Sequence, residues 1–306
     1  MKTKVVYILT MGRHGYRYFE MLLLSILSLK RHNPGVRTEV VTDPASQAQL
    51  GERAGAFPPD VRLRVVEVPQ EWDEYKSRYL KTKLRLLVEG DYLFVDVDTL
   101  VAGSLEAIDR IKADIAAVPD GNGPLGLWNR SEAVLCQRAG VPSPMGMPYF
   151  NSGVMYVKDT PAAYIFFEQW HRLWKASAPK VRGRDQMSLL AANDRLGRPL
   201  RELPGEWNCQ IYHSPSIHYF RKAKILHYYL CGFIEGFVLP HMKGGILDDE
   251  AQALAAAPLQ KGFRFYFQGH IRLSLPWSHV LHLSRKSIPL FLYLKSLTVR
   301  IASLWS

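Results

Sequence analysis

The stretch Tyr92-Leu93-Phe94-Val95-Asp96-Val97-Asp98-Thr99-Leu100 is an apolar run of strand length that carries two aspartates towards its end. A continuous apolar run is typical of a strand that is covered on both faces of a sheet. In open α/β sheets ligands bind beyond the carboxyl ends of the strands, so we expect a site at Asp96 and Asp98. Val97, between them, would point back into the core if the extended backbone continues.

Two carboxylates one residue apart repel each other unless a cation lies between them. A divalent cation, Mg²⁺ or Mn²⁺, held by one or two carboxylates and by phosphate oxygens is a common solution. The alternative is a strand that ends in a polar turn, with Asp98 capping the next segment. The Asp-x-Asp pattern alone does not decide between these two interpretations.

Strand and helix patterns alternate along the first 230 residues. We predict strands at 4–10, 38–42, 61–68, 92–100, 114–118, 149–157, 200–203 and 224–227, and helices at 18–30, 45–54, 79–88, 105–111, 161–174 and 186–193. The alternation predicts an α/β fold with a mostly parallel, right-handed central sheet flanked by helices. We interpret the aperiodic, glycine- and proline-rich segment 121–147 as a surface excursion around the site.

The positive charge is concentrated at the end of the chain. Lysine and arginine number 39 against 28 aspartates and glutamates, a net charge of +11, and no acidic residue follows Glu250. The cations beyond it are Lys261, Arg264, Arg272, Arg285, Lys286, Lys295 and Arg300. Such a tail suggests an anionic partner, and since no nucleic-acid-binding motif accompanies it, we expect no nucleic acid.

The tail also has a helical pattern. Leu290, Leu294, Leu297, Ile301 and Leu304 recur at helical spacing, and the cations of this segment lie off that stripe. We therefore predict a catalytic domain at 1–245 and a basic amphipathic extension at 246–306 that lies on an anionic membrane surface. The alternatives are a helix docked on its own domain or one side of a dimer.

The cysteines and the search for export and membrane-spanning signals predict the cellular compartment. Three cysteines without a pattern favour a reducing cytosol. No apolar run reaches the roughly 18 residues that cross a bilayer, and no signal-peptide pattern precedes the first strand. We expect a cytoplasmic protein that is peripheral on the inner face of the membrane.

Several motifs occur in the order found in GT-A fold glycosyltransferases of family 8, which includes glycogenin and bacterial lipopolysaccharide galactosyl- and glucosyltransferases, and the chain resembles that family from about residue 4 to 230. The matching blocks are Tyr79-Leu80-Lys81-Thr82-Lys83-Leu84, Phe94-Val95-Asp96-Val97-Asp98, Tyr149-Phe150-Asn151-Ser152-Gly153-Val154-Met155, Asp185-Gln186, Leu203-Pro204 to Trp207-Asn208, and Ile225-Leu226-His227. Each block is short, but the ordered set is fairly specific.

The resemblance implies a metal-dependent transfer of a sugar from a nucleotide-sugar, a UDP-sugar, to a glycan or lipid-linked acceptor, with retention of configuration. Asp96, Asp98 and His227 would hold Mn²⁺ (or Mg²⁺), and the imidazole favours Mn²⁺. The residues implied at the donor are Thr10, Lys81, Asp96, Val97, Asp98 and Gly153. The residues implied in catalysis are Asn151, Asp185 and Gln186.

Each of these residues has a simpler interpretation when it is taken alone. Asn151 can be a turn residue at a strand start, and Asp185 can be the N-cap of the following helix. His227 can be an ordinary core or surface histidine, and Lys81 can lie on a solvated helix face. Their shared order favours function, most for the two aspartates and least for Lys81.

The sequence departs from the family pattern at three places. The first strand ends in Thr10-Met11-Gly12, without the acid or amide expected near the nucleotide base. Lysine stands at position 81, where the family usually has arginine, which binds phosphate differently. After His227 the expected glycine comes late, at Gly232, and no lysine follows until Lys243, so one phosphate clamp is either lost or supplied by Arg221, Lys222 or Lys224.

Two other functions fit parts of the sequence. Haloacid dehalogenase-type phosphatases also end a strand in Asp-x-Asp, and Asp96 would then be a nucleophile. Against this, Thr99 is one position early and no later Gly-Asp-x-x-x-Asp follows. The second alternative is a non-enzymatic, membrane-associated glycan-binding module with an incomplete site.

Overall fold

The computed structural model describes residues 1–12, 17–123, 130–141, 148–210, 216–220 and 222–227, together with the short strands at 242–243 and 246–247. The elements are β1 Lys4–Leu9, α1 Arg17–His32, β2 Thr38–Thr42, α2 Pro44–Leu50, β3 Val61–Val65, α3 Lys76–Thr82, α4 Leu84–Leu87, β4 Tyr92–Val95, β5 Thr99–Val101, β6 Ile115–Pro119, α5 Arg130–Ala139, β7 Phe150–Val157, α6 Pro161–Ser177, α7 Gln186–Arg195, β8 Arg201–Glu202, β9 Cys209–Gln210, α8 Ile217–Phe220, β10 Ile225–His227, β11 Met242–Lys243 and β12 Ile246–Leu247.

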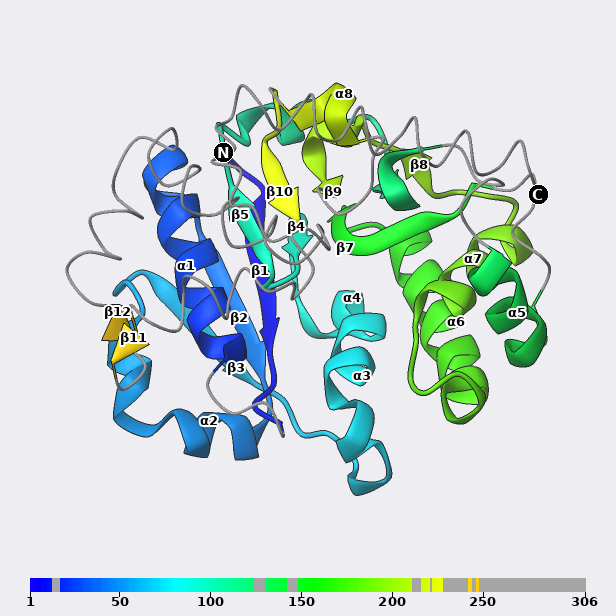
Figure 1. Cartoon of the computed structure of the whole chain (residues 1–306), viewed down its shortest axis with the longest axis horizontal. Coiled ribbons are helices and arrows are strands. Elements are labelled where there is room, and N and C mark those ends of the chain that lie inside the picture. Colours follow the sequence, from blue (N-terminus) through cyan, green and yellow to red (C-terminus); the bar gives the residue numbers. More distant parts are fainter. Residues whose placement is uncertain are drawn as a thin grey trace, which may run out of the picture.

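The central sheet has the strand order β3-β2-β1-β4-β7-β6-β8. Alternate residues of β4 face opposite sides: Leu93 and Val95 belong to the core beneath α1, while Tyr92 and Phe94 belong to the core beneath α3 and α6. Figure 1 shows α1 on one side of β1, and α3, α4, α6 and α7 together on the other. The predicted α/β class is therefore confirmed, and β4 is covered on both faces as its apolar sequence indicates.

The sheet is mostly parallel, but β7 runs antiparallel to both of its neighbours, β4 and β6. Antiparallel pairing sets the start of β7 against the end of β4: Val95 lies opposite Val154, and the Asp96 amide donates to the Gly153 carbonyl over 2.7 Å. A parallel β7 would bring its far end there instead. The direction of β7 is therefore what places Asn151, Ser152 and Gly153 beside the aspartates.

The predicted strand 92–100 is in fact two strands in two sheets. The chain leaves the central sheet after Val95, and Thr99–Val101 forms β5 in a second sheet of order β5-β10-β9. The Thr99 hydroxyl donates to the Asp96 carbonyl over 2.8 Å and holds the turn between the sheets. In this second sheet Thr99 lies opposite His227, so the pairing brings the histidine next to Asp98.

The prediction of one helix at 79–88 was wrong, because two short helices, α3 and α4, replace it. Two cations of this segment are buried: Lys81 is 3% and Arg85 0% exposed. The Arg85 guanidinium donates to the carbonyls of Val88 and Gly90, pairs with Asp159 at 3.6 Å, and lies 5.0 Å from the ring centroids of Tyr92 and Tyr164. A cation can be buried here because carbonyls, a carboxylate and aromatic faces replace water around it.

Several smaller expectations changed as well. The predicted helix 105–111 is a 3₁₀ turn at Glu106–Arg110. Helix α6 begins as predicted, with Pro161 in its first turn and the Thr160 hydroxyl accepting from the Ala163 amide over 3.4 Å. Within the described part of the chain, every helix is too short or too polar to cross a membrane. The predicted amphipathic helix beyond Pro289 lies outside the described residues. The segment 121–147, interpreted as an aperiodic excursion, contains the helix α5, Arg130–Ala139, so that interpretation was wrong for this part, while 124–129 and 142–147 lie outside the described residues.

Candidate active site

Three predicted metal ligands lie together at the end of β4. One ligand atom from each of Asp96, Asp98 and His227 can be chosen so that all lie within 4.8 Å of one another. The Nε2 atom of His227 is 3.2 Å from Oδ1 of Asp98. Two carboxylates and an imidazole at this spacing suit a divalent cation such as Mn²⁺.

His227 is oriented by a buried amide behind it. Its Nδ1 lies 3.1 Å from Oδ1 of Asn208, which is fully buried. The Nδ2 group of Asn208 donates to Oδ1 of Asn151 over 2.9 Å, so its oxygen is the atom that faces the imidazole. An amide oxygen accepts from Nδ1–H, so Nε2 is the ring nitrogen left for a metal ion, and it lies at hydrogen-bond distance from Asp98.

The hydrogen bonds that begin at His227 and Asn208 continue through Asn151 to Asp120. Oδ1 of Asn151 also accepts from the Gly153 amide, and its Nδ2 donates to Oδ1 of Asp120 over 2.9 Å. Gln186 donates to the same Asp120 oxygen over 3.0 Å. Asp120, Asn151 and Gln186 therefore form one polar group, connected through Asn208 to His227.

Gly153 is the point where these side chains meet. A Cβ built on Gly153 would lie 2.4 Å from Cε1 of His227, 2.8 Å from Oδ1 of Asn151 and 2.9 Å from Oδ2 of Asp96. These distances are shorter than real Cβ contacts allow. Glycine at this position is therefore required by the close packing of the site.

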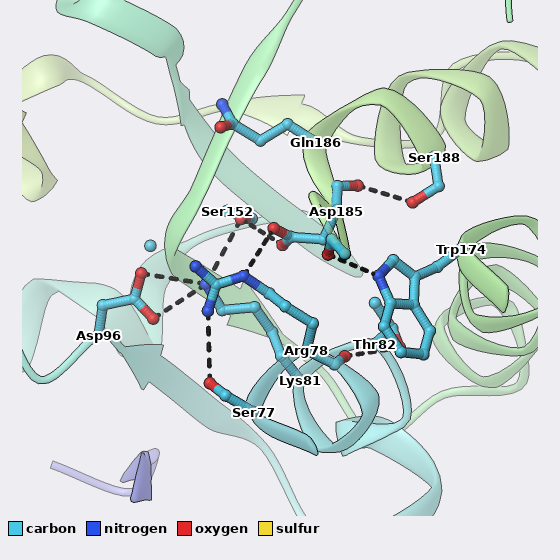
Figure 2. Close-up of polar contacts among 12 residues, drawn as sticks. Ser77, Arg78, Lys81, Thr82, Asp96, Ser152, Trp174, Asp185, Gln186 and Ser188 are labelled. Carbon is cyan, nitrogen blue, oxygen red and sulfur yellow. Dashed lines mark hydrogen bonds and ion pairs between the residues drawn. The ribbon is translucent and has the colours of Figure 1, made fainter. Parts of the chain in front are cut away.

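Two cations from α3 lie between Asp96 and Asp185 (Figure 2). Lys81 Nζ is 2.9 and 3.0 Å from the two Asp96 oxygens and donates to Ser152 Oγ over 3.4 Å. The Ser152 hydroxyl donates to Oδ2 of Asp185 over 2.7 Å, and Arg78 Nε is 3.1 Å from Oδ1 of Asp185. The buried Lys81 excludes the solvated-face interpretation.

The surroundings shift the pKa values of Asp96, Asp98 and Asp185 in different directions. Burial raises the pKa of Asp96, and the charge of Asp98 raises it further against the opposing effect of Lys81. Although burial opposes it, His227 lowers the pKa of Asp98, and Lys81 with Arg78 lowers the pKa of Asp185. Asp96 is thus the carboxylate that most needs a neighbouring cation to stay ionised.

Asp185 stands at the N-cap position of α7, but its side chain makes no cap hydrogen bond. Its carboxylate contacts Arg78 and Ser152 instead, while its carbonyl accepts from Trp170 Nε1 over 3.2 Å. The simpler N-cap interpretation of this side chain is therefore wrong.

The remaining predicted residues lie apart from these contacts. Thr10 directly follows β1 and is half-buried, and Val97 packs at the edge of the core on the α1 side. Lys222 and Lys224, suggested as a phosphate clamp, lie 3.6 and 4.0 Å from Glu206. Arg221 lies outside the described residues.

Sequence reasoning missed Arg78 and Asp120, and it included Asn208 only as part of a matching block. Arg78 precedes Lys81 by three residues, a spacing that puts two side chains on one helix face, so this signal was available. Asp120 directly follows β6 at the same end of the sheet. Asn208 had no local signal, because its partners come from β7 and β10.

Comparison with known proteins identifies the fold. No protein-family model matches the sequence, and no curated protein matches it. The structure resembles galactosyltransferase LgtC in complex with donor and acceptor sugar analogues, with a TM-score of 0.53 and 17% identity over 74% of this chain and 87% of that one. It also resembles an active-site mutant of LgtC, with a TM-score of 0.55 and 16% identity over 83% and 95% of the two chains.

Mouse xyloside xylosyltransferase 1 is similar to the same extent, with a TM-score of 0.51 and 15% identity over 75% of this chain and 98% of that one. At identities this low the similarity establishes the architecture alone. It says nothing about which substrates this chain uses. The chain therefore has the fold of the GT-A glycosyltransferases.

Proposed function

We propose that the protein is a metal-dependent glycosyltransferase, of the family 8 type, that moves a sugar from a UDP-sugar to a glycan or lipid-linked acceptor with retention of configuration. The observation that carries the proposal is the convergence of Asp96, Asp98 and His227 at the end of β4 in a GT-A fold. The proposed donor and stereochemistry rest on the sequence resemblance.

The three proposed ligands fit Mn²⁺ by their chemistry and by their support. Asn208 fixes the imidazole so that Nε2 faces Asp98, and the two aspartates supply hard oxygen ligands. When bound, the cation would supply Lewis-acid stabilisation of the charge that develops on the leaving diphosphate.

The protein's own groups divide into two sets around this position. Lys81 and Arg78 provide positive charge for a diphosphate on the α3 side, and Asp185 holds both in place through Ser152 and a direct ion pair. On the other side, Asp120, Asn151 and Gln186 present oxygens and amides that can hydrogen-bond sugar hydroxyls. Such contacts would fix the geometry of attack.

We propose further that the basic tail binds an anionic membrane from the cytoplasmic side, where a lipid-linked acceptor is available. The support is compositional: seven cations and no acidic residue beyond Glu250, with apolar residues at helical spacing.

Asp98→Asn tests the catalytic proposal, because it removes a ligand charge and changes no volume. We expect transfer to fall at least a hundredfold, with an unchanged circular dichroism spectrum. The donor is identified by calorimetric titration with a panel of nucleotide-sugars, with and without Mn²⁺. Unchanged turnover in Asp98→Asn would exclude the metal assignment.

The same experiments separate the alternatives. A phosphatase with Asp96 as nucleophile would release phosphate from simple phosphomonoesters without any sugar acceptor. A glycan-binding module would bind glycans but no nucleotide-sugar in Mn²⁺. The GT-A fold favours transfer over both.

A further inference from the structure

Lys81 lies where it can act as an internal substitute for the divalent cation. We propose that Lys81 neutralises Asp96 in the metal-free protein and is displaced from it when a divalent cation binds Asp96 and Asp98, which frees its ammonium for the donor diphosphate. The inference rests on the metal and donor site proposed above, and it assigns to Lys81 two successive partners.

The first partner is defined by the geometry. Lys81 Nζ contacts both oxygens of Asp96, at 2.9 and 3.0 Å, and the lysine side chain is only 4% exposed against 24% for Asp96. A small divalent cation binds a carboxylate oxygen at about 2.1 Å, much closer than an ammonium does. The two positive groups would therefore repel each other while competing for one carboxylate.

A path away from Asp96 already exists beside the ammonium. Ser152 Oγ is 3.4 Å from Nζ and donates to Asp185, so a small rotation moves the ammonium from one acid towards the other. The Phe94 ring, with its centroid 5.0 Å from Nζ, offers the ammonium a cation–π contact. Lysine suits such a movement because its charge is a point on a flexible chain, whereas arginine binds in a fixed planar fork.

Displacement has a measurable consequence for affinity. Because Lys81 must leave Asp96 first, the free protein should bind Mn²⁺ more weakly than its ligands alone would allow. A diphosphate that accepts hydrogen bonds from the freed ammonium should restore the lost Mn²⁺ affinity. Mn²⁺ and a nucleoside diphosphate should therefore strengthen each other's binding.

Lys81→Met tests this, because it keeps the length of the side chain and removes the charge. We expect Mn²⁺ alone to bind at least tenfold more tightly than to the wild type, and UDP in saturating Mn²⁺ to bind at least tenfold more weakly, both by calorimetry. The matched control is Lys83→Met, which removes the same charge from a lysine whose ammonium donates to the Tyr79 hydroxyl and lies over the Tyr79 ring. Its two affinities should stay within twofold of the wild type.

A second measurement uses the unaltered chain and does not depend on whether a variant folds. Wild-type crystals grown with Mn²⁺ and UDP should show Nζ of Lys81 more than 4 Å from both Asp96 oxygens and in contact with the diphosphate. An ammonium still on Asp96 beside a bound metal would overturn the inference, as would equal Mn²⁺ affinities in Lys81→Met and wild type. Absence of Mn²⁺ binding in both proteins would instead defeat the proposed metal site itself.

Discussion

Gly153 determines, at the scale of single residues, how closely the metal ligands approach β7. An added Cβ would overlap His227, Asn151 and Asp96 at once, and the Asn151 oxygen and the histidine ring are held by Asn208. We predict that Gly153→Ala weakens Mn²⁺ binding at least tenfold and lowers the free energy of unfolding by about 1–3 kcal/mol, the usual effect of overpacking.

Calorimetry and urea denaturation measure the two effects of Gly153→Ala. Gly103→Ala is the control, because the nearest atom to its added Cβ would be the Ala223 carbonyl oxygen at 4.0 Å. If both variants behaved alike, the close packing around Gly153 would have no functional meaning.

Asn208 carries a second prediction at this scale, because it accepts from the metal-side histidine and donates to Asn151. Asn208→Leu removes both contacts, and we expect Mn²⁺ affinity to fall roughly 10- to 100-fold, as is usual for groups that orient a metal ligand. Asn208→Asp keeps the acceptor for Nδ1–H and loses the donor to Asn151. It should therefore retain Mn²⁺ binding while transfer declines.

The comparison of the two Asn208 variants separates orientation of His227 from a general structural role. Equal loss of Mn²⁺ affinity in both, measured by the electron paramagnetic resonance of free Mn²⁺, would contradict the role of the Asn208 oxygen in orienting His227.

At the scale of elements, α3 and α6 are joined by an aromatic and hydroxyl contact at His171. Its Nδ1 is 2.8 Å from the Thr82 hydroxyl, and its ring packs against Tyr79 and Trp174. Burial lowers the pKa of His171 to about 4, and the charges of Lys175 and Lys83 add to the effect. The folded protein therefore keeps this imidazole neutral at a pH where the unfolded chain protonates it.

Stability should decline on acidification for this reason. Between the ordinary pKa of 6.5 and the folded value of about 4, the unfolded state binds more protons, so the free energy of unfolding falls as pH falls. His171→Phe keeps an aromatic ring and removes the titrating group. Between pH 7 and pH 5 we expect the free energy of unfolding of this variant to fall by about 1 kcal/mol less than that of the wild type, a figure reduced for the partial exposure of the imidazole. Denaturant unfolding at the two pH values measures the difference, and parallel losses in both proteins would contradict the prediction.

At the scale of the whole molecule, the sequence predicts the layers of the fold well because local patterns encode them. The apolar runs give the strands and the capped, periodic segments give the helices. The order of the motifs predicts Asp96, Asp98 and His227 as one site, and the three side chains lie together in the structure.

The direction of β7 and the break after Val95 could not be predicted, because both depend on pairing between distant strands. The pattern is apolar before and after the aspartates, so nothing local separates β4 from β5. The burial of Lys81 and Arg85 escaped prediction for a related reason. Their partners, an aspartate at the end of β4 and carbonyls beyond α4, come from outside their helices.

The basic extension should bind an anionic membrane through its apolar stripe and its cations together. Removal of residues 289–306 deletes the apolar stripe together with Lys295 and Arg300, and leaves the site residues and the five other cations beyond Glu250 in place. We expect the shortened protein to lose most of its co-sedimentation with vesicles containing phosphatidylserine, while its Mn²⁺ affinity is unchanged. Binding of the full chain should weaken with added salt, since each cation near such a surface contributes about 1 kcal/mol that salt screens.

The matched variant is Lys295→Ser with Arg300→Ser, which keeps the apolar stripe and removes only the charge. An interfacial helix needs both anionic attraction and apolar burial, so this variant should bind more weakly than the full chain and more strongly than the truncation. Equal vesicle binding in all three proteins would contradict the membrane proposal and indicate that the apolar stripe packs on the catalytic domain or on a second copy of the chain. If it packs on the catalytic domain, the truncated chain should also have a lower free energy of unfolding than the full chain.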